Sequence, residues 1–419
     1  MNILKNKLIR SLGIYTFSNI INSAIPFLLL PILTNHLTTS DYGILTNYNS
    51  VINILIPFVG VNMMTSLQVI FVKRKEEFAS YISSGTILTI VLTLLFTLII
   101  FIFQDYLARI SGVPKGYLLL TAVYATYNNL IETLLSIWRM EEKAIHYGVF
   151  RIGRTIVELS IALILIIGYN WSFDGSIYAI IYSYGIGAFV TLFILYKKGL
   201  LIVEIKKKHI KHILQYGVPL IPHVLSSVVI MYSSKLMLTA YHGLSSNGIY
   251  SVGFMVGQFI GLLQNSFNQA WVPWVYQQLK SGEHSKKIRI VKLTYIYFIG
   301  IIVVTIAFWL SSPLIYLFLG KAFESGISLV LWIALGFAFN GMYKMVSVYF
   351  FYEEKTKELA VLSVFSAVVN IGLNFLWIPE YGFTGAALAT MLAMLIQFIL
   401  AWIWSTKIVK MPWGLTKLK

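Results

Sequence analysis

The stretch that decides the fold is residues 216–274, which read YGVPLIPHVLSSVVIMYSSKLMLTAYHGLSSNGIYSVGFMVGQFIGLLQNSFNQAWVPW. It holds two apolar segments, each long enough to cross a bilayer, joined by a short polar turn. One ammonium group, that of Lys235, lies in the outer part of the first segment. Because a lysine near the bilayer centre costs about 2.5–3.5 kcal/mol, we expect Lys235 to have a functional role.

The whole chain has the composition of a polytopic membrane protein. Of its 419 residues, 58% are hydrophobic and 11% are charged, and the mean hydropathy is +0.78. The lack of cysteine excludes disulfides and thiolate metal sites, and the seven histidines show no metal-ligand spacing. The basic N-terminus leads into an apolar region without a cleavage site, which indicates an uncleaved first span.

Long apolar runs predict an all-α membrane protein with twelve transmembrane helices. The predicted spans are 11–33, 43–71, 82–104, 116–138, 147–169, 175–196, 213–240, 247–274, 290–312, 326–351, 358–378 and 383–405. Arg109, Lys115 and Lys321 lie in outer loops, Lys235 and Lys344 lie within spans, and the other basic residues lie in inner segments. This bias places both termini in the cytoplasm. The net charge of +16 is therefore a signal of topology and does not indicate nucleic-acid binding.

The sequence repeats itself in two halves. Residues 33–44 (LTNHLTTSDYGI) align without gaps with residues 238–249 (LTAYHGLSSNGI), and each segment is the turn between the first two spans of a half. A weaker echo relates Phe173 and Gly175 to Phe383 and Gly385, before the last span of each half. An even number of spans between the copies preserves orientation, which indicates a parallel repeat. We predict two pseudo-symmetric six-helix lobes, 1–196 and 213–419, joined by a cytoplasmic linker at 197–212.

Polar side chains gather on eight of the predicted spans. The spans 82–104, 175–196, 290–312 and 383–405 are apolar nearly all round and are expected to face lipid. The others should surround a shared aqueous cavity between the lobes, because polar groups that face hydrocarbon each lose several kcal/mol. Hydrogen bonding between helices is the alternative for any single amide. The candidate cavity residues are Tyr15, Asn19, Asn22, Asn49, Asn265, Asn268 and Asn340.

Lys235 and Lys344 are candidates for an anion site. The span lengths place Lys235 near the outer interface and Lys344 in the inner half of its helix. If both face the cavity, two ammonium groups at different depths would suit a phosphate group that changes sides. The alternatives are that Lys235 snorkels to the interface, and that Lys344 snorkels inward or pairs with Glu353 or Glu354.

Glu132 and Glu158 are the acids within the predicted spans of the first half. Arg154 precedes Glu158 by four residues, which is the spacing of an ion pair on one helix face. A structural ion pair is therefore one interpretation. The other is that Glu158 or Glu132 binds a proton or cation that drives a transport cycle.

Prolines occur in the first span of each half. Pro26 and Pro31 lie in the first half, and Pro219 and Pro222 lie in the second. Proline removes a backbone hydrogen bond and bends a helix, so these positions are candidate hinges for alternating access. A static kink is the alternative.

Two long segments resemble a known family. They are YTFSNIINSAIPFLLLPILTNHLTTSDYGIL (15–45) and KLMLTAYHGLSSNGIYSVGFMVGQFIGLLQNSFNQAWVPW (235–274), and FTGAALAT (383–390) adds a weaker likeness. They resemble the polysaccharide (O-antigen) flippases, the Wzx-type branch of the multidrug/oligosaccharidyl-lipid/polysaccharide (MOP) exporter superfamily.

The resemblance implies a V-shaped pair of six-helix lobes in the bacterial inner (plasma) membrane. Such a protein moves an undecaprenyl-pyrophosphate-linked oligosaccharide to the outer leaflet by alternating access, for O-antigen or capsule-type polysaccharide. The resemblance implies a cavity-facing basic residue at Lys235, which with Lys344 would bind pyrophosphate, while the polar cavity residues would bind glycan. Relatives often have an acid before that lysine, whereas this chain has Ser234. Polymerase and chain-length proteins of the same pathway are the expected protein partners.

Two other functions compete with the flippase. A cation-coupled multidrug antiporter of the same fold would need an acid in its first span, and the span 11–33 has none. A membrane enzyme that joins lipid-linked sugars would need catalytic carboxylates or a large outer loop. The chain shows no nucleophile motif, glycine-rich phosphate loop or metal cluster. We therefore expect a flippase that is not an enzyme and needs no cofactor.

Overall fold

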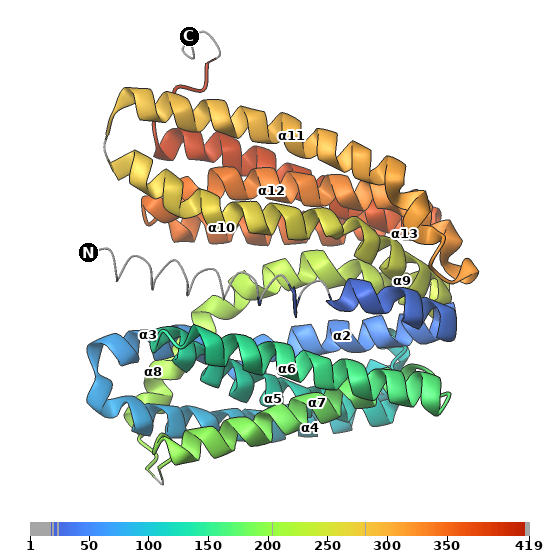
Figure 1. Cartoon of the computed structure of the whole chain (residues 1–419), viewed down its shortest axis with the longest axis vertical. Helices are drawn as coiled ribbons and strands as arrows, with labels where there is room; N and C mark the ends of the chain where they lie inside the picture. Colours follow the sequence, from blue (N-terminus) through green and yellow to red (C-terminus); the bar gives the residue numbers. More distant parts are fainter. Residues whose placement is uncertain (1–17, 19–20, 23–24, 203, 281, 415–419) are drawn as a thin grey trace. The chain divides into compact units, whose positions relative to one another are not determined.

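The computed structural model describes residues 18, 21–22, 25–202, 204–280 and 282–414, and the regular elements in these residues are all helical (Figure 1). The chain divides into two compact units, Met1–Val228 and Val229–Lys419. The division falls inside α9, beyond the linker that the sequence predicts at 197–212. Tyr15 and Asn19 lie outside the described residues.

The first unit is built around α5. Its elements are the helix Ile25–His36, α2 (Thr39–Gly60), α3 (Met63–Lys73), the 3-10 turn η1 (Lys75–Glu77), α4 (Phe78–Ser111), α5 (Lys115–Met140), α6 (Ala144–Leu163), the π-helical segment η2 (Ile164–Gly168), α7 (Phe173–Lys197), α8 (Lys207–Gly217), the 3-10 turn η3 (Val218–Leu220) and the start of α9 (Ile221–Gly257). The helix α5 packs against α2, α4 and α7. Its C-terminal half, with Leu134 and Leu135, supplies much of the buried core.

The second unit is built around α12. It contains the rest of α9, α10 (Phe259–Lys280), α11 (His284–Tyr316), the 3-10 segment η4 (Lys321–Leu329), α12 (Val330–Tyr352) and α13 (Thr356–Ile408). The helix α12 packs against α13, α10 and α11, and its side chains are mostly buried. In contrast, α11 exposes large apolar side chains such as Ile299 and Leu310, as α4 does with Leu94 and Ile102. This exposure is what lipid-facing helices require.

The turns of the predicted repeat are breaks in the helices. The helix α2 begins with a capping box, in which Thr38 Oγ1 accepts from the Asp41 amide at 3.1 Å and the Thr38 amide donates to Asp41 Oδ2 at 3.2 Å. The aligned position in the second half is Gly243, whose φ of 81° and ψ of 174° interrupt α9. Likewise Ser172 precedes α7, and the aligned Gly382 (φ 53°, ψ −131°) interrupts α13. The two halves therefore break at equivalent positions.

The described helices make this chain a multi-pass membrane protein. Six segments are long and apolar enough to cross a membrane, or seven if α2 and the residues Met63–Phe71, bent by 40°, count as one span. Twelve separate spans are not confirmed by length and composition alone. Two of the segments, Val224–Lys280 and Thr356–Ile408, have 57 and 53 residues, more than twice the roughly 20 that one crossing needs. The cytoplasmic position of both termini stays a prediction.

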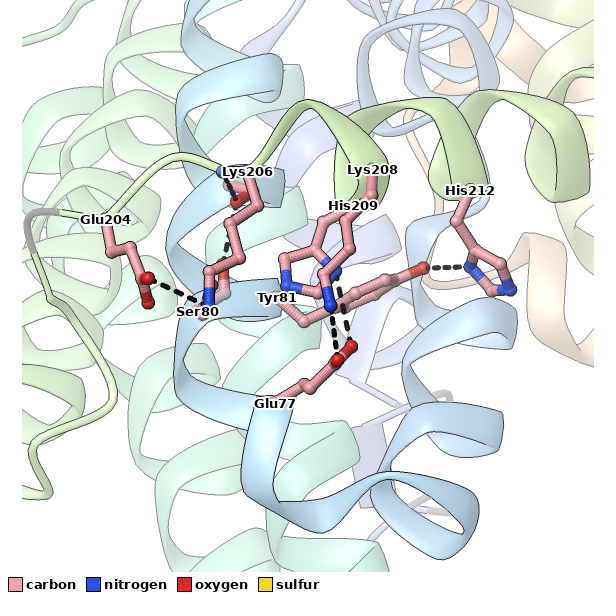
Figure 2. Close-up of polar contacts among 9 residues, drawn as sticks. Glu77, Ser80, Tyr81, Glu204, Lys206, Lys208, His209 and His212 are labelled. Carbon is pink, nitrogen blue, oxygen red and sulfur yellow. Dashed lines mark hydrogen bonds and ion pairs between the residues drawn. The ribbon is translucent and has the colours of Figure 1, made fainter.

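The linker helix α8 is docked on the first unit (Figure 2). Lys208 Nζ donates a hydrogen bond to Glu77 Oε1, and His209 Nδ1 lies 3.8 Å from Glu77 Oε2. The Tyr81 hydroxyl pairs with His212 Nδ1 at 2.9 Å, and its ring meets the His209 ring edge to face. The side chain of His209 is only 3% exposed. Glu77 and Tyr81 thus hold one turn of α8 against η1 and α4.

Backbone groups of the linker are also satisfied by α4. The Lys206 amide donates to Ser84 Oγ at 3.2 Å, and the Ile202 amide donates to Ser83 Oγ at 2.9 Å. Ser83 in turn donates to the Leu200 carbonyl at 3.3 Å. Because these bonds fix the main chain on both sides of residue 203, the linker that enters α8 belongs structurally to the first unit.

Acidification is expected to loosen the docking of α8. Burial lowers the pKa of His209 from 6.5, against an opposing but smaller effect of the Glu77 charge, and the hydrogen bond from Lys208 lowers the pKa of Glu77. A folded-state pKa below the unfolded value gives stability that is present above the unfolded pKa and is lost as the pH falls through the folded pKa. The stability that His209 contributes to the folded state is thus lost as the pH falls below its ordinary pKa of 6.5. The stability that Glu77 contributes is lost as the pH falls below its ordinary pKa of 4.5.

Hydrogen exchange of the α8 amides, corrected for intrinsic rates, measures this loosening between pH 7 and about pH 5. We expect faster exchange at the lower pH in the wild type and a smaller pH effect in His209→Gln. The variant His284→Gln, at an exposed position that begins α11, is the matched control. An equal pH effect in the wild type and in His209→Gln would contradict the prediction.

Candidate functional site

Lys235 is held against two aromatic rings in α9. Its Nζ lies 5.3 Å from the centroid of the Tyr232 ring and 4.9 Å from that of Phe254. The residue is only 9% exposed, and in the described part of the chain no carboxylate pairs with its ammonium. Cation–π contacts attract an ammonium but do not neutralise it. An anionic ligand could therefore pair with this ammonium group.

Ser233 and Ser234, the two residues that precede Lys235, belong to a network of neutral hydrogen-bonding groups. Ser234 Oγ donates to Asn374 Oδ1 at 3.1 Å and lies 3.2 Å from Thr390 Oγ1. Ser233 Oγ donates to Asn370 Oδ1 at 2.9 Å, while Asn370 Nδ2 is buried without a hydrogen-bond partner among the described residues. The network joins α9 to both halves of α13. Asn370 and Asn374 lie one turn apart on α13, and sequence reasoning did not find their serine and threonine partners.

Lys344 contacts one of the other predicted site residues. From α12, its Nζ donates a hydrogen bond to Asn265 Oδ1 on α10. One turn away, Gln264 Nε2 donates to Asn340 Oδ1 at 3.2 Å. The structure thus brings Lys344, Asn265 and Asn340 together at the α10–α12 contact, and adds Gln264, which sequence reasoning missed. Lys344 bonds an amide here, and not the Glu353 or Glu354 side chain that the sequence left open.

The two lysines make separate sets of contacts within the second unit. Lys235 contacts rings of α9, and Lys344 contacts an amide of α10. Neither ammonium has an acidic partner in the described residues, although paired lysines occur elsewhere, such as Lys198 with Glu141 at 2.6 Å. Asn268, on the turn of α10 that follows Asn265, is half-buried. The second unit therefore holds two ammonium groups within its helices that an acid does not neutralise.

Arg154 and Glu158 form an ion pair in the first unit. Arg154 Nη1 lies 2.7 Å from Glu158 Oε2, with side chains 10% and 25% exposed, and the guanidinium lies 4.0 Å from the centroid of the Tyr184 ring. Next to it, Thr155 Oγ1 donates to Asn22 Oδ1 at 2.6 Å. The Arg154–Glu158 contact is the ion pair of the structural interpretation, and a role of Glu158 in ion coupling stays a prediction.

The remaining predicted site residues of the first unit have other contacts. Glu132 Oε2 is 3.6 Å from Arg139 Nη2, and both side chains are exposed. Asn49 is half-buried in α2, and its carbonyl accepts a hydrogen bond from Asn53 Nδ2 at 2.7 Å. In the described residues, no group of three or more histidine, aspartate or glutamate side chains could hold a metal ion.

The predicted hinge prolines differ between the halves. Pro26 is the second residue of the helix Ile25–His36, and Pro31 lies in its interior. Pro219 lies in the turn η3, and Pro222 lies in the first turn of α9, where a proline removes no intrahelical hydrogen bond. Sequence reasoning did not select the prolines inside later helices, which are Pro57, Pro273, Pro313 and Pro379.

The sequence places this chain in a known family. Residues 8–279 match the family model Polysacc_synt, described as polysaccharide biosynthesis protein. The chain belongs to the polysaccharide biosynthesis protein family. The match includes all of the first unit that the structure describes, together with Lys235 and Asn265, and it ends within α10. The resemblance that the sequence motifs indicate is thereby confirmed.

Two relatives of this polysaccharide biosynthesis protein come from Haemophilus influenzae. An uncharacterized membrane protein is 24% identical over 378 residues, which are 87% of this chain and 89% of that protein. The Lsg locus putative protein 1 is 22% identical over 399 residues, which are 91% of this chain and 95% of that protein. Both likenesses therefore extend over nearly the whole length of each protein.

Solved structures identify the fold of the polysaccharide biosynthesis protein. The inward-facing conformation of a multidrug resistance MATE family transporter of the MOP superfamily matches with a TM-score of 0.77 and 16% identity, over 92% of this chain and 94% of that chain. The lipid II flippase MurJ, in an inward closed conformation, matches with a TM-score of 0.72 and 17% identity, over 100% of this chain and 89% of that chain. The chain therefore has the fold shared by MATE transporters and MurJ.

Proposed function

We propose that this protein is a flippase that moves an undecaprenyl-pyrophosphate-linked oligosaccharide across the bacterial inner membrane, for O-antigen or capsule-type polysaccharide. The observation that carries the proposal is the pair of ammonium groups, Lys235 and Lys344, within the helices of the second unit. An ammonium is a good partner for phosphate oxygens. A charged side chain inside a membrane helix costs free energy, so its presence there indicates a function. Membership of the polysaccharide biosynthesis protein family supports the glycan part of the proposal.

Lys235 and Lys344 would bind the pyrophosphate, and amides would bind the sugars. Asn265 and Asn340 stand beside Lys344, so a headgroup held there would meet hydrogen-bond donors and acceptors at once. Neutral partners suit this task, because a carboxylate beside the ammonium would compete with the substrate for its charge. The other residues proposed for glycan binding are Tyr15, Asn19, Asn22, Asn49 and Asn268.

The proposal includes twelve spans with both termini in the cytoplasm and alternating access as the mechanism. The breaks at Gly243 and Gly382 support this number, because each divides an overlong helical segment into pieces of membrane-crossing length. A glycosyl polymerase and a chain-length protein of the same pathway are proposed partners.

The test uses a strain that lacks the gene, complemented with the wild type or with Lys235→Ala plus Lys344→Ala. We expect the deletion to remove the surface glycan and to raise lipid-linked precursors inside the cell. Only the wild type should restore display, because two lost phosphate contacts at about 1.5–3 kcal/mol each would lower the rate by more than tenfold.

The matched control is Lys286→Ala, which removes an exposed lysine paired with Glu283. It should restore display as well as the wild type does, and the amounts of all variants in the membrane are compared by immunoblot. If the double variant restores display at an equal amount, the pyrophosphate site is wrong. If the deletion leaves the glycan intact and makes the strain sensitive to drugs, a multidrug antiporter replaces the flippase.

A further inference from the structure

The helix α8 has two faces of different chemistry. His209, Ile213 and Gly217, spaced by four residues, form the buried face. Lys207, Lys211 and Gln215 repeat at the same spacing and are all exposed. Because residues four apart lie on one side of a helix, these three form a stripe opposite the buried face, which we name the outward stripe.

The lysines of the outward stripe differ from their neighbours on the linker. Lys206 Nζ lies 2.8 Å from Glu204, and Lys208 is bonded to Glu77 (Figure 2). In the described residues, no carboxylate pairs with Lys207 or Lys211. The stripe therefore presents two positive charges that no carboxylate of the described residues neutralises.

Apolar and aromatic groups border the outward stripe. Ile210 and Leu214 are half-buried on one side of it. On the other side, the rings of His212 and Tyr216 stack at 6.1 Å, and Tyr216 is 39% exposed. Exposed Ile205 and Val218 lie just before and just after the helix. Lysines flanked by aliphatic and aromatic side chains are typical of helices that lie in the interface of a membrane.

We propose that the outward stripe of α8 binds anionic phospholipid headgroups, with Lys207 and Lys211 as the contacting cations. Charge complementarity selects this occupant, because the two free ammonium groups attract anionic headgroups and the flanking apolar groups enter the acyl boundary. The docking on Glu77, Tyr81 and Ser84 fixes the orientation of the stripe, so its binding loses little conformational entropy. The outward stripe shares no residue with the proposed substrate site, and the proposal does not depend on that site.

The test places a fluorophore beside the two lysines in the full-length protein. The chain has no cysteine, so Gln215→Cys carries a single label on the same stripe. The labelled protein is reconstituted in phosphatidylcholine nanodiscs with about one third phosphatidylglycerol, an anionic lipid. In parallel samples either phosphatidylglycerol or phosphatidylcholine carries a brominated chain, which quenches nearby fluorophores. The ratio of the two quenching constants, per brominated lipid, measures the local preference for the anionic lipid.

We expect a ratio of about fivefold or more at low salt that falls toward one at high salt, because each lysine near an anionic surface contributes about a fivefold preference. In Lys207→Gln plus Lys211→Gln the ratio should be close to one at every salt concentration. The matched control, Lys292→Gln plus Lys357→Gln, removes two exposed lysines from the second unit and should keep the wild-type ratio.

Two outcomes would overturn the proposal. One is a wild-type ratio of one, or a ratio that the Lys207 and Lys211 changes leave intact. The other is that the wild type shows no lipid preference but binds inorganic pyrophosphate in pure phosphatidylcholine discs, and that the double variant does not bind it. The stripe would then bind a soluble phosphate compound and not a lipid headgroup. Glycan display is not part of this assay, so failure of the flippase proposal would leave its result unchanged.

Discussion

Replacing Arg154 with leucine is expected to lower the free energy of unfolding by about 3–5 kcal/mol. The change leaves the Glu158 carboxylate, 25% exposed, without the guanidinium that lies 2.7 Å away. It also removes the cation that lies over the Tyr184 ring. A partly buried charge that loses its partner must either stay unpaired or take up a proton, and both lower stability. Thermal unfolding of the purified protein in one detergent measures the loss.

A double-mutant cycle separates the ion pair from the packing of either side chain. Glu158→Leu alone should also destabilise the protein, whereas Arg154→Leu with Glu158→Leu should lose less than the sum, because neither charge is then stranded. If the loss of unfolding free energy in the double variant equals the sum of the two single losses within about 0.5 kcal/mol, the two residues are not coupled. A fully stable Glu158→Leu variant would reopen the interpretation of Glu158 as an ion-coupling acid.

Replacing Gly217 with alanine is expected to destabilise the first unit by about 3 kcal/mol. A Cβ at this position would lie 1.8 Å from the Val61 carbonyl oxygen and 2.9 Å from the Val61 carbonyl carbon. The backbone there cannot easily retreat, because Val61 and Asn62 already have positive φ angles of 44° and 46° at the bend between α2 and α3. The Asn62 side chain also donates to the Gly217 carbonyl at 3.3 Å.

The control for this prediction is Gly300→Ala. Apart from the backbone of its own helix and its chain neighbours, a Cβ on Gly300, inside α11, would meet no heavy atom of the described residues within 4 Å. Alanine is the better helix former, so this variant should be as stable as the wild type or more stable by up to about 1 kcal/mol. Equal unfolding temperatures for the two variants would mean that α8 and the α2–α3 bend do not make the close contact that the structure shows.

Local patterns predicted the all-helical fold and the positions of two helix breaks. The polar segment at 238–249 contains Gly243, and the echo at Phe383 follows Gly382, so the sequence located both interruptions of the long helices. The Arg154–Glu158 pair was also predicted as one interpretation, because its partners lie on adjacent turns of one helix. Such features depend only on residues that are close along the chain.

Contacts between distant residues could not be predicted in the same way. Lys344 bonds Asn265 across 79 positions, and Ser234 contacts Thr390 across 156 positions. Finding these partners requires knowing which faces of α10, α12 and α13 pack together, and uniform apolar runs do not reveal that. The docking of α8 on η1 and α4 was missed for the same reason, because 131 positions separate Glu77 from Lys208.

The turn between the first two helices of each half is made by different means. In the first half, the Thr38 and Asp41 side chains hold it through hydrogen bonds. In the second half, Gly243 makes it through a backbone conformation that other residues rarely adopt. A substitution that leaves one turn intact can therefore disrupt the other, because the first depends on side-chain hydrogen bonds and the second on the backbone of a glycine. The relation between the two halves can therefore be recognised from the position of the helix break even where the aligned residues differ.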